Sequence, residues 1–182
     1  LDAGDRITYD AFRYGREIAI ESYRYPSELL PIDQLFNRPT QFAVMGAGSG
    51  VHPFATAQDY DNFLARMDGF VVWFEQAINN MRSGAAKGIV QPRIVIERTI
   101  PQLAALAVDD PKESLLRRPI LNLPAGLSTA DRQRIVPAWD RKLDTEVLPA
   151  IRRLHDYLAN DYLPATRPSV GVSELPNGDA WY

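Results

Sequence analysis

Two histidines, His52 and His155, carry the side chains of this sequence that most readily bind a metal ion or exchange a proton near neutral pH. A zinc hydrolase needs clustered imidazole and carboxylate ligands, typically two histidines one helical turn apart with a glutamate between them. His52 lies in a glycine-rich stretch before Pro53, whereas His155 follows Leu154 far along the chain. We therefore interpret both as surface or hydrogen-bonded histidines, and predict neither a metal site nor a cofactor in this chain.

Two other patterns look like parts of active sites but lack the surroundings that such sites need. Residues 46–50, GAGSG, put a serine between glycines as a hydrolase nucleophile elbow does, yet no strand pattern precedes them. They also lack the Lys-Ser/Thr pair of a phosphate-binding loop. The carboxylate pairs Asp59/Asp61 and Asp109/Asp110 fall at expected helix ends, where carboxylates stabilise free backbone N–H groups. The sequence therefore predicts no catalytic residue.

An aromatic-rich stretch, residues 70–74 with sequence FVVWF, allows two interpretations. Its side chains could form the wall of a ligand site, or they belong to a buried contact between helices. Asp68 and Glu75 flank the stretch, so the apolar run falls far short of the roughly 20 residues that span a membrane. We favour the buried contact and expect no transmembrane segment.

The composition is that of an ordinary globular domain. The chain has 182 residues, 46% of them hydrophobic and 24% charged, and a chain of this length buries a core without crosslinks. The formal net charge is -3 and basic residues cluster only in pairs, so nucleic acid is not an expected partner. The absence of cysteine excludes disulfides and thiolate ligands but leaves the compartment open.

Apolar residues recur every three or four positions in four segments, which predicts amphipathic helices. These helices are expected over residues 5–23, 56–82, 92–107 and 128–162, with a shorter one over 112–116 and a long loop with room for a helical turn over 26–53. Fourteen prolines and eleven glycines punctuate the segments. The sequence predicts an all-α fold of several long antiparallel helices with long loops rich in proline and glycine, in a single region spanning residues 1–182.

Capping residues mark where two of these helices begin. Thr56 with Asp59, and Ser128 with Asp131, have the spacing at which a hydroxyl and a carboxylate take up the free N–H groups of a first turn. We therefore place the starts of the second and fourth long helices at these residues.

Proline and glycine mark the expected interruptions. Proline lacks a backbone donor, and its ring crowds the carbonyl four residues earlier. We expect Pro101 to kink or split its helix, Pro149 to bend or break the long helix, and Pro137 to mark a second irregularity. Gly84 and Gly88 are expected to end the helix that begins near residue 56.

The last segment changes character. Asn177-Gly178 is a strong tight-turn signal and predicts the start of a β-hairpin whose second strand covers residues 179–182. The chain starts at Leu1 and ends on two aromatic residues. We therefore expect a fragment of a larger protein, with the continuation of the hairpin outside the sequence.

Several short stretches, taken together, resemble one bacterial family. In chain order they are Pro53-Phe54, DYDNFLAR at 59–66, NMRSG at 80–84, GIVQPR at 88–93, VLPA at 147–150, DYLP at 161–164, Gly171, and LPNGDAWY at 175–182. The combination resembles the middle of the domain-of-unknown-function family numbered 885, and the resemblance covers the chain from about Thr56 onward.

The resemblance implies a helical part of a larger enzyme-like protein. Members of that family are long, largely helical proteins, often exported or lipid-anchored, and they resemble zinc metallopeptidases through a His-Glu-containing segment. That segment lies downstream of the matched region, so no metal ligand or catalytic glutamate is carried over to this chain. The resemblance therefore implies a non-catalytic portion that shapes one wall of a peptide-binding cleft. Its partner would be the remainder of the parent polypeptide, which would also hold any zinc.

Three polar residues of the matching stretches lie near loops, namely Arg93, Asn177 and Tyr182. We expect them to face the cleft and a peptide substrate, with helix-end and turn roles as the alternative. A second hypothesis for the whole chain, from another class, is a stand-alone helical binding or scaffold domain. The parent gene beyond Tyr182 separates the two hypotheses: the first requires a His-Glu metal-binding segment, the second a stop codon or an unrelated domain.

Overall fold

The computed structural model describes residues 2–181, which form helices joined by loops. The α-helices are Ala3–Glu21 (α1), Arg38–Met45 (α2), Ala57–Ala86 (α3), Arg93–Ala104 (α4), Arg118–Leu121 (α5), Thr129–Lys142 (α6), Leu148–Asp156 (α7), Leu163–Ala165 (α8) and Gly178–Trp181 (α9). Over residues 2–181 there is no strand, only an isolated bridge between Pro92 and Arg167. The predicted all-α fold is confirmed. In the same range, no helix is both long and apolar enough to cross a membrane.

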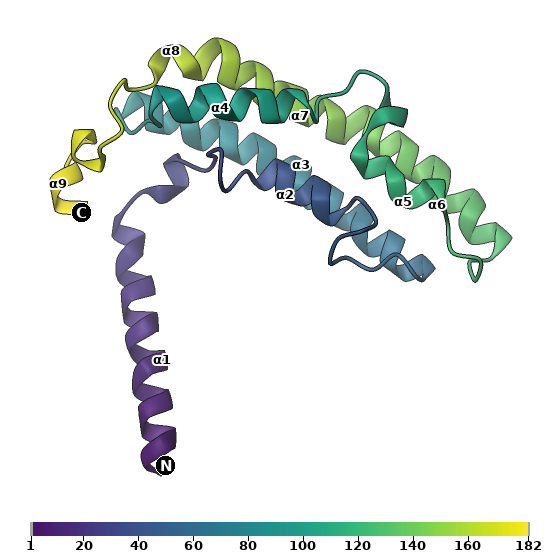
Figure 1. Cartoon of the computed structure of the whole chain (residues 1–182), viewed down its shortest axis with the longest axis horizontal. Helices are drawn as coiled ribbons and strands as arrows, with labels where there is room; N and C mark the ends of the chain where they lie inside the picture. The colour runs from purple at the N-terminus through teal and green to yellow at the C-terminus, as the bar shows by residue number, and fades with distance from the viewer. Residues whose placement is uncertain (1, 182) are drawn as a thin grey trace.

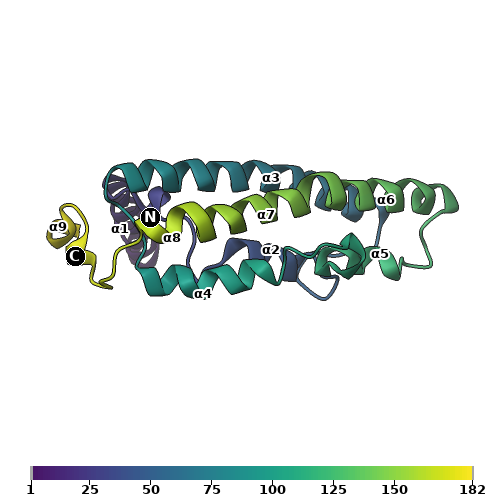
Figure 2. The same ribbon diagram turned by 90° about the horizontal axis from the view of Figure 1, so that it is seen from above.

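A bundle of three long elements forms the body of the molecule: α3, α4, and the continuous helix that runs from α6 through α7 to α8 (Figures 1 and 2). α4 is antiparallel to its neighbours, since Gln91 near its start bonds to Tyr162 whereas Val108 beyond its end bonds to Arg152. α3 and the α6–α8 helix run in the same direction, because the return passage through α4 brings the chain back to the end where α3 began.

Ion pairs between α3 and the α6–α8 helix fix their parallel register. Along α3, Asp61, Asp68 and Glu75 pair in order with Arg134, Lys142 and Arg153. Hydrogen bonds to Asp68 and Glu146 raise the pKa of Lys142 against the opposing effect of burial. These pairs are mostly half-exposed, so each stabilises by at most about 1 kcal/mol. Their main effect is to favour one axial register of the two helices over others.

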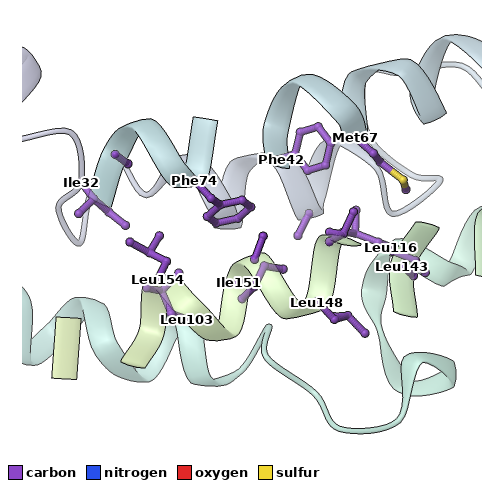
Figure 3. Close-up of a cluster of buried hydrophobic side chains, with 14 of the residues drawn as sticks. Ile32, Phe42, Met67, Phe74, Leu103, Leu116, Leu143, Leu148, Ile151 and Leu154 are labelled. Atoms are coloured by element: carbon purple, nitrogen blue, oxygen red, sulfur yellow. The ribbon is translucent and has the colours of Figure 1, made fainter. Parts of the chain in front are cut away.

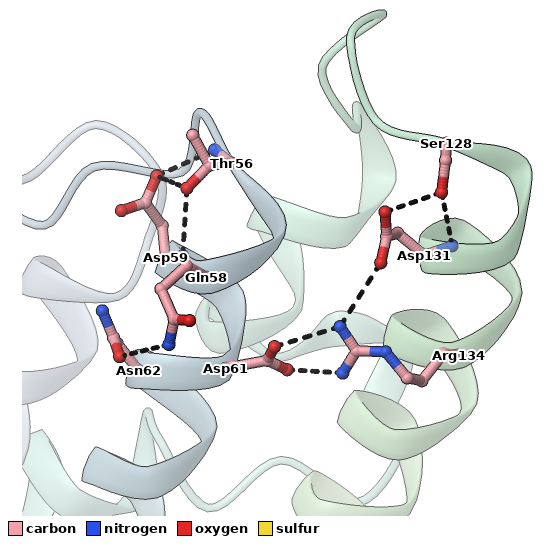
Figure 4. Close-up of polar contacts among 8 residues, drawn as sticks. All are labelled: Thr56, Gln58, Asp59, Asp61, Asn62, Ser128, Asp131 and Arg134. Atoms are coloured by element: carbon pink, nitrogen blue, oxygen red, sulfur yellow. Dashed lines mark hydrogen bonds and ion pairs between the residues drawn. The ribbon is translucent and has the colours of Figure 1, made fainter.

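The helix starts follow the predicted capping residues (Figure 4). Thr56 caps α3 by accepting from the backbone N–H of Asp59, whose carboxylate accepts from the backbone N–H of Thr56 at 2.8 Å. Ser128 caps α6 by accepting from the backbone N–H of Asp131 at 3.0 Å. Arg134 donates to Asp61 near the start of α3 and contacts Asp131 in the first turn of α6, so it links the N-terminal ends of the two helices.

The core lies where α3, α4 and α7 meet (Figure 3). Its side chains are large, apolar and almost completely excluded from water; they include Ile32, Phe63, Met67, Phe74, Met81, Ile96, Leu103, Ile135, Trp139, Leu143, Leu148 and Leu154. Removing each such side chain from water stabilises the fold by roughly 1.5–3 kcal/mol. This apolar burial, and not the half-exposed ion pairs, dominates the free energy of folding.

Two π turns interrupt the longest helix, at Leu143–Val147 and Tyr157–Tyr162. The first occurs where buried residues are spaced by four, at positions 135, 139, 143, 147 and 151. An α-helix with 3.6 residues per turn rotates such a series off its face by about 40° per step, and a wider turn corrects the drift. Pro149 and Pro164 each follow a π turn, whose wider path accommodates a proline ring. The irregularity predicted at Pro149 is therefore a π turn and not a break.

The other interruptions differ in part from the prediction. α3 continues through Gly84 to Ala86, α4 runs through Pro101 without the split that was one alternative, and α6 runs through Pro137. Gly84 is a contact residue: a Cβ there would lie 2.6 Å from the carbonyl oxygen of Ile89. The end of α3 is set by Gly88, which adopts φ 72°.

The predicted β-hairpin at Asn177-Gly178 is also wrong, because these residues lead into the short helix α9. A hairpin turn of this type needs two residues with positive φ, and only Asn177 adopts one, at 60°. The backbone N–H of Gly178 donates to Leu175, and that of Ala180 donates to Asn177. Trp181 then makes an edge contact with Tyr25 at a centroid distance of 6.1 Å.

α1 projects away from the bundle (Figure 1). None of the side chains from Ala3 to Glu21 is buried, although the predicted helix and its apolar stripe are present. Its exposed large apolar residues are Ile7, Tyr9, Phe12, Tyr14, Ile18 and Ile20. In this structure α1 therefore depends on its own cap and hydrogen bonds.

Candidate functional site

Two of the three polar residues predicted to face a cleft, Arg93 and Asn177, lie at one end of the bundle, but they do not form a cluster. Arg93 is the first residue of α4, and its guanidinium pairs with Glu97 at 2.9 Å. Exposed Asn177 forms the turn before α9, next to Pro176, which packs near Gly88. No contact joins Arg93 to Asn177 in the part of the chain that the structure describes, and Tyr182 lies outside that part. Helix-end and turn geometry accounts for the two described residues.

The same end of the bundle is held by buried polar contacts that sequence reasoning missed. The backbone N–H of Gln91 donates to the hydroxyl of Tyr162 at 3.0 Å, and burial raises the pKa of that hydroxyl to about 12. Arg167 donates to the carbonyl oxygens of Val90, Ser169 and Gly171. Burial lowers the pKa of Arg167. The Tyr162 hydroxyl satisfies a backbone N–H group and Arg167 satisfies backbone carbonyl oxygens, so we assign both side chains to loop anchoring.

The two histidines are separate, as their sequence positions indicated. His52 is buried, with Nε2 2.9 Å from the carbonyl oxygen of Asp59 and its ring against Phe54 and Phe63. His155 lies with Nδ1 3.0 Å from a carboxylate oxygen of Asp156. Within residues 2–181, no group of three or more histidine, cysteine, aspartate or glutamate residues is placed to hold a metal ion.

An open groove between α2 and the middle of α3 is the best candidate for ligand binding; we call it the α2/α3 groove. Its volume is about 590 Å³, within the range of ligand sites. The rings of Phe42 and Phe70 stack at 4.0 Å, and those of Phe70 and Trp73 stack at 5.3 Å. Phe42 is buried, whereas Phe70 and Trp73 are only partly covered. The groove therefore offers aromatic surface to a ligand.

Two arginines give the α2/α3 groove its charge. Arg38 is the first residue of α2, and Nη1 of Arg66 lies 4.0 Å from the sulfur of Met45, the last residue of α2. Both arginines are exposed, and among residues 2–181 no carboxylate lines the groove. In the described part of the chain, neither arginine belongs to an ion pair. By contrast, Arg134 of α6 and Arg153 of α7 both pair with carboxylates of α3. The groove is thus apolar with free positive charge at both ends.

A second hollow, of about 740 Å³, adjoins the groove where the chain passes from α1 toward α2. Arg38 and Trp73 line both hollows, so the two are neighbours. The second hollow also contains Glu28 and Asp33, and the carboxylate of Asp33 accepts from the backbone N–H groups of Leu35 and Phe36. Because both carboxylates and an arginine line this hollow, it would discriminate less between ligands of opposite charge than the α2/α3 groove does.

The aromatic stretch 70–74 combines the two interpretations that its sequence allowed. Phe74 is fully buried in the contact between helices, while Phe70 and Trp73 line the groove. Sequence reasoning did not find Arg38, because the loop expected over residues 26–53 gave no reason to place it beside α3. The available signal was Arg66, which lies one helical turn before Phe70 and so shares its face.

The fold and these contacts define the class of protein as an all-α helical bundle with an open aromatic groove. The family model described as bacterial protein of unknown function DUF885 matches residues 1–182, and the chain belongs to that family. The match includes residues 1–52, which the short sequence stretches did not cover. No curated protein and no solved structure matches the chain.

Proposed function

We propose that this chain is the non-catalytic helical portion of a metallopeptidase-like protein and forms one wall of its peptide-binding cleft. The observation that carries the proposal is the α2/α3 groove, an open apolar hollow with aromatic side chains on its wall and unpaired arginines at its ends. Apolar surface that binds side chains, with a few charged groups that fix orientation, is what peptide recognition requires. The family membership supports a larger, largely helical parent.

The proposal divides the chemistry between two parts of the parent. His52 and His155 each lie beside a different aspartate, so a zinc-bound water would need ligands from the His-Glu segment that the family resemblance implies beyond residue 182. This chain would contribute side chains that bind and orient the peptide. By the same resemblance, we propose that the parent is exported or lipid-anchored.

Metal analysis and a peptide-library assay on the longest natural reading frame that contains residues 1–182, with the 182-residue chain in parallel, test this proposal. The longer protein is expected to bind zinc stoichiometrically and to hydrolyse peptides, and the 182-residue chain to do neither. A tight zinc site in the 182-residue chain alone would refute the proposed division. So would a longer reading frame that lacks a His-Glu segment.

A stand-alone helical binding or scaffold domain is the second candidate function. The exposed apolar side chains along α1 favour it, because such a helix is a common docking element for another protein. Under this function a stop codon or an unrelated domain follows in the gene. The reading frame that tests the first proposal therefore also separates it from the second.

A further inference from the structure

The ends of the α2/α3 groove are spaced so as to recognise two negative charges on one ligand. Arg38 begins α2, and Arg66 contacts Met45 at its end, so about 10 Å of helix axis separates the two positions at 1.5 Å per residue. Guanidinium groups bind carboxylates through paired hydrogen bonds. A ligand that satisfies both ends therefore carries two carboxylates separated by about the length of α2.

The middle of the groove accepts an apolar side chain. Phe70 and Trp73 are stacked with an interplanar angle of 4° and remain partly exposed between the two arginines. Gly69 leaves space beside them, because a Cβ built there meets no atom within 4 Å. An aromatic or large aliphatic side chain that enters this space removes apolar surface from water and contacts the exposed rings.

An extended peptide matches this pattern. Alternate side chains of an extended chain point to the same face, so residues i, i+2 and i+4 present three side chains over about 13 Å. We propose that the α2/α3 groove binds an extended peptide segment with an apolar residue between two acidic ones, at alternate positions. This inference rests on the proposed function in that it assigns a sequence class to the peptide at the cleft wall.

The probe is a pentapeptide with the sequence glutamate-alanine-phenylalanine-alanine-glutamate, acetylated and amidated so that only side chains carry charge. Calorimetric titration of the 182-residue chain should show binding that weakens as salt is added. The peptide with glutamine in place of both glutamates loses two charge-assisted contacts, and the peptide with alanine in place of phenylalanine loses the aromatic contact. Each should bind at least about tenfold more weakly.

Substitutions in the protein locate the binding. Arg38→Gln and Arg66→Gln should each weaken the acidic probe about tenfold and leave the glutamine peptide unaffected, and Arg98→Gln, an exposed arginine outside the groove, serves as their matched control. Gly69→Trp should abolish binding by filling the space, whereas Gly69→Ala should not. Circular dichroism verifies that each variant is folded, which the open space at Gly69 favours.

Three results overturn the inference. The first is probe binding that survives both Gly69→Trp and Arg66→Gln, and the second is no probe binding at all by a folded chain. The third is a dimer of the unliganded chain that Gly69→Trp converts to a monomer, which would assign the groove to a second copy. Each of these results leaves zinc binding and peptide hydrolysis by the longer protein untouched, so a failure here is distinct from a failure of the proposed function.

Discussion

The indole N–H of Trp139 donates to the carbonyl oxygen of Leu116 at 2.8 Å, inside a ring of stacked and edge-on aromatic side chains. This bond links α6 to the irregular segment that follows α4. Trp139 is completely buried and its ring stacks on Phe63 of α3 at 5.5 Å. One side chain therefore joins three parts of the molecule.

Replacing Trp139 with phenylalanine should destabilise the fold by about 2–4 kcal/mol, because it leaves a cavity and a buried carbonyl without its donor. Urea unfolding followed by far-ultraviolet circular dichroism measures the change. Trp73→Phe is the control, since Trp73 is only partly buried and its loss should cost less than about 1 kcal/mol. Equal effects of the two substitutions would contradict the assigned role of Trp139.

Gly84 and Gly69 make a matched pair within α3. A Cβ at Gly84 would lie 2.6 Å from the carbonyl oxygen of Ile89 and 3.1 Å from that of Leu29, whereas one at Gly69 would meet nothing within 4 Å. Gly84→Ala should therefore destabilise by about 1–3 kcal/mol through displaced backbone. Gly69→Ala should stabilise by up to about 1 kcal/mol through helix propensity. Thermal melts of both variants check the opposite signs.

The buried hydroxyl of Tyr162 predicts a loss of stability at high pH. Its pKa is raised to about 12 by burial, from an ordinary value near 10 in the unfolded chain. The folded state therefore holds this proton more tightly. The stabilisation is fully present below pH 10 and is lost as the pH rises toward 12.

Tyr162→Phe should flatten the fall in unfolding free energy between pH 10 and 12, as measured by urea unfolding across that range. At neutral pH the variant should lose about 1 kcal/mol, because the backbone N–H of Gln91 loses its acceptor. Tyr9→Phe, on exposed α1, is the control at neutral pH, where it should leave the unfolding free energy nearly unchanged. An unaltered profile for Tyr162→Phe would show that this hydroxyl titrates normally.

α1 should be the least protected helix in hydrogen exchange. None of its residues from Ala3 to Glu21 is buried, and most of the stability of helices in proteins comes from the packing that α1 lacks. Mass spectrometry of the 182-residue chain should show exchange in α1 that is orders of magnitude faster than in the middle of α3. Protection of α1 equal to that of α3 would mean that another molecule covers it in solution.

Local signals in the sequence placed the long helices well. Capping residues such as Thr56 and Ser128 act through bonds within one turn, so they were readable without tertiary information, and both helix starts agree with the structure. The apolar spacing over residues 56–82 likewise predicted a helix with one apolar face, and Phe63 and Met67 on that face are fully buried.

Tertiary contacts decided what the sequence could not. Gly84 looks like a helix end, but its role is set by the carbonyl of Ile89, which is recognised only once the chain is folded. Asn177 takes up the positive φ that a hairpin needs while Gly178 does not, so a helical turn forms instead. Arg38 lines the groove because α2 packs beside α3, and the spacing of residues along the sequence does not show that contact.

The two π turns affect how length variants of this chain should behave. A π turn contains one residue more than the α-helical path it replaces, so the segments 143–147 and 157–162 each contain one extra residue. Deleting a residue there lets the helix tighten with little displacement of the parts beyond it. The same deletion in α3 would rotate everything downstream by about 100° and turn core side chains toward solvent.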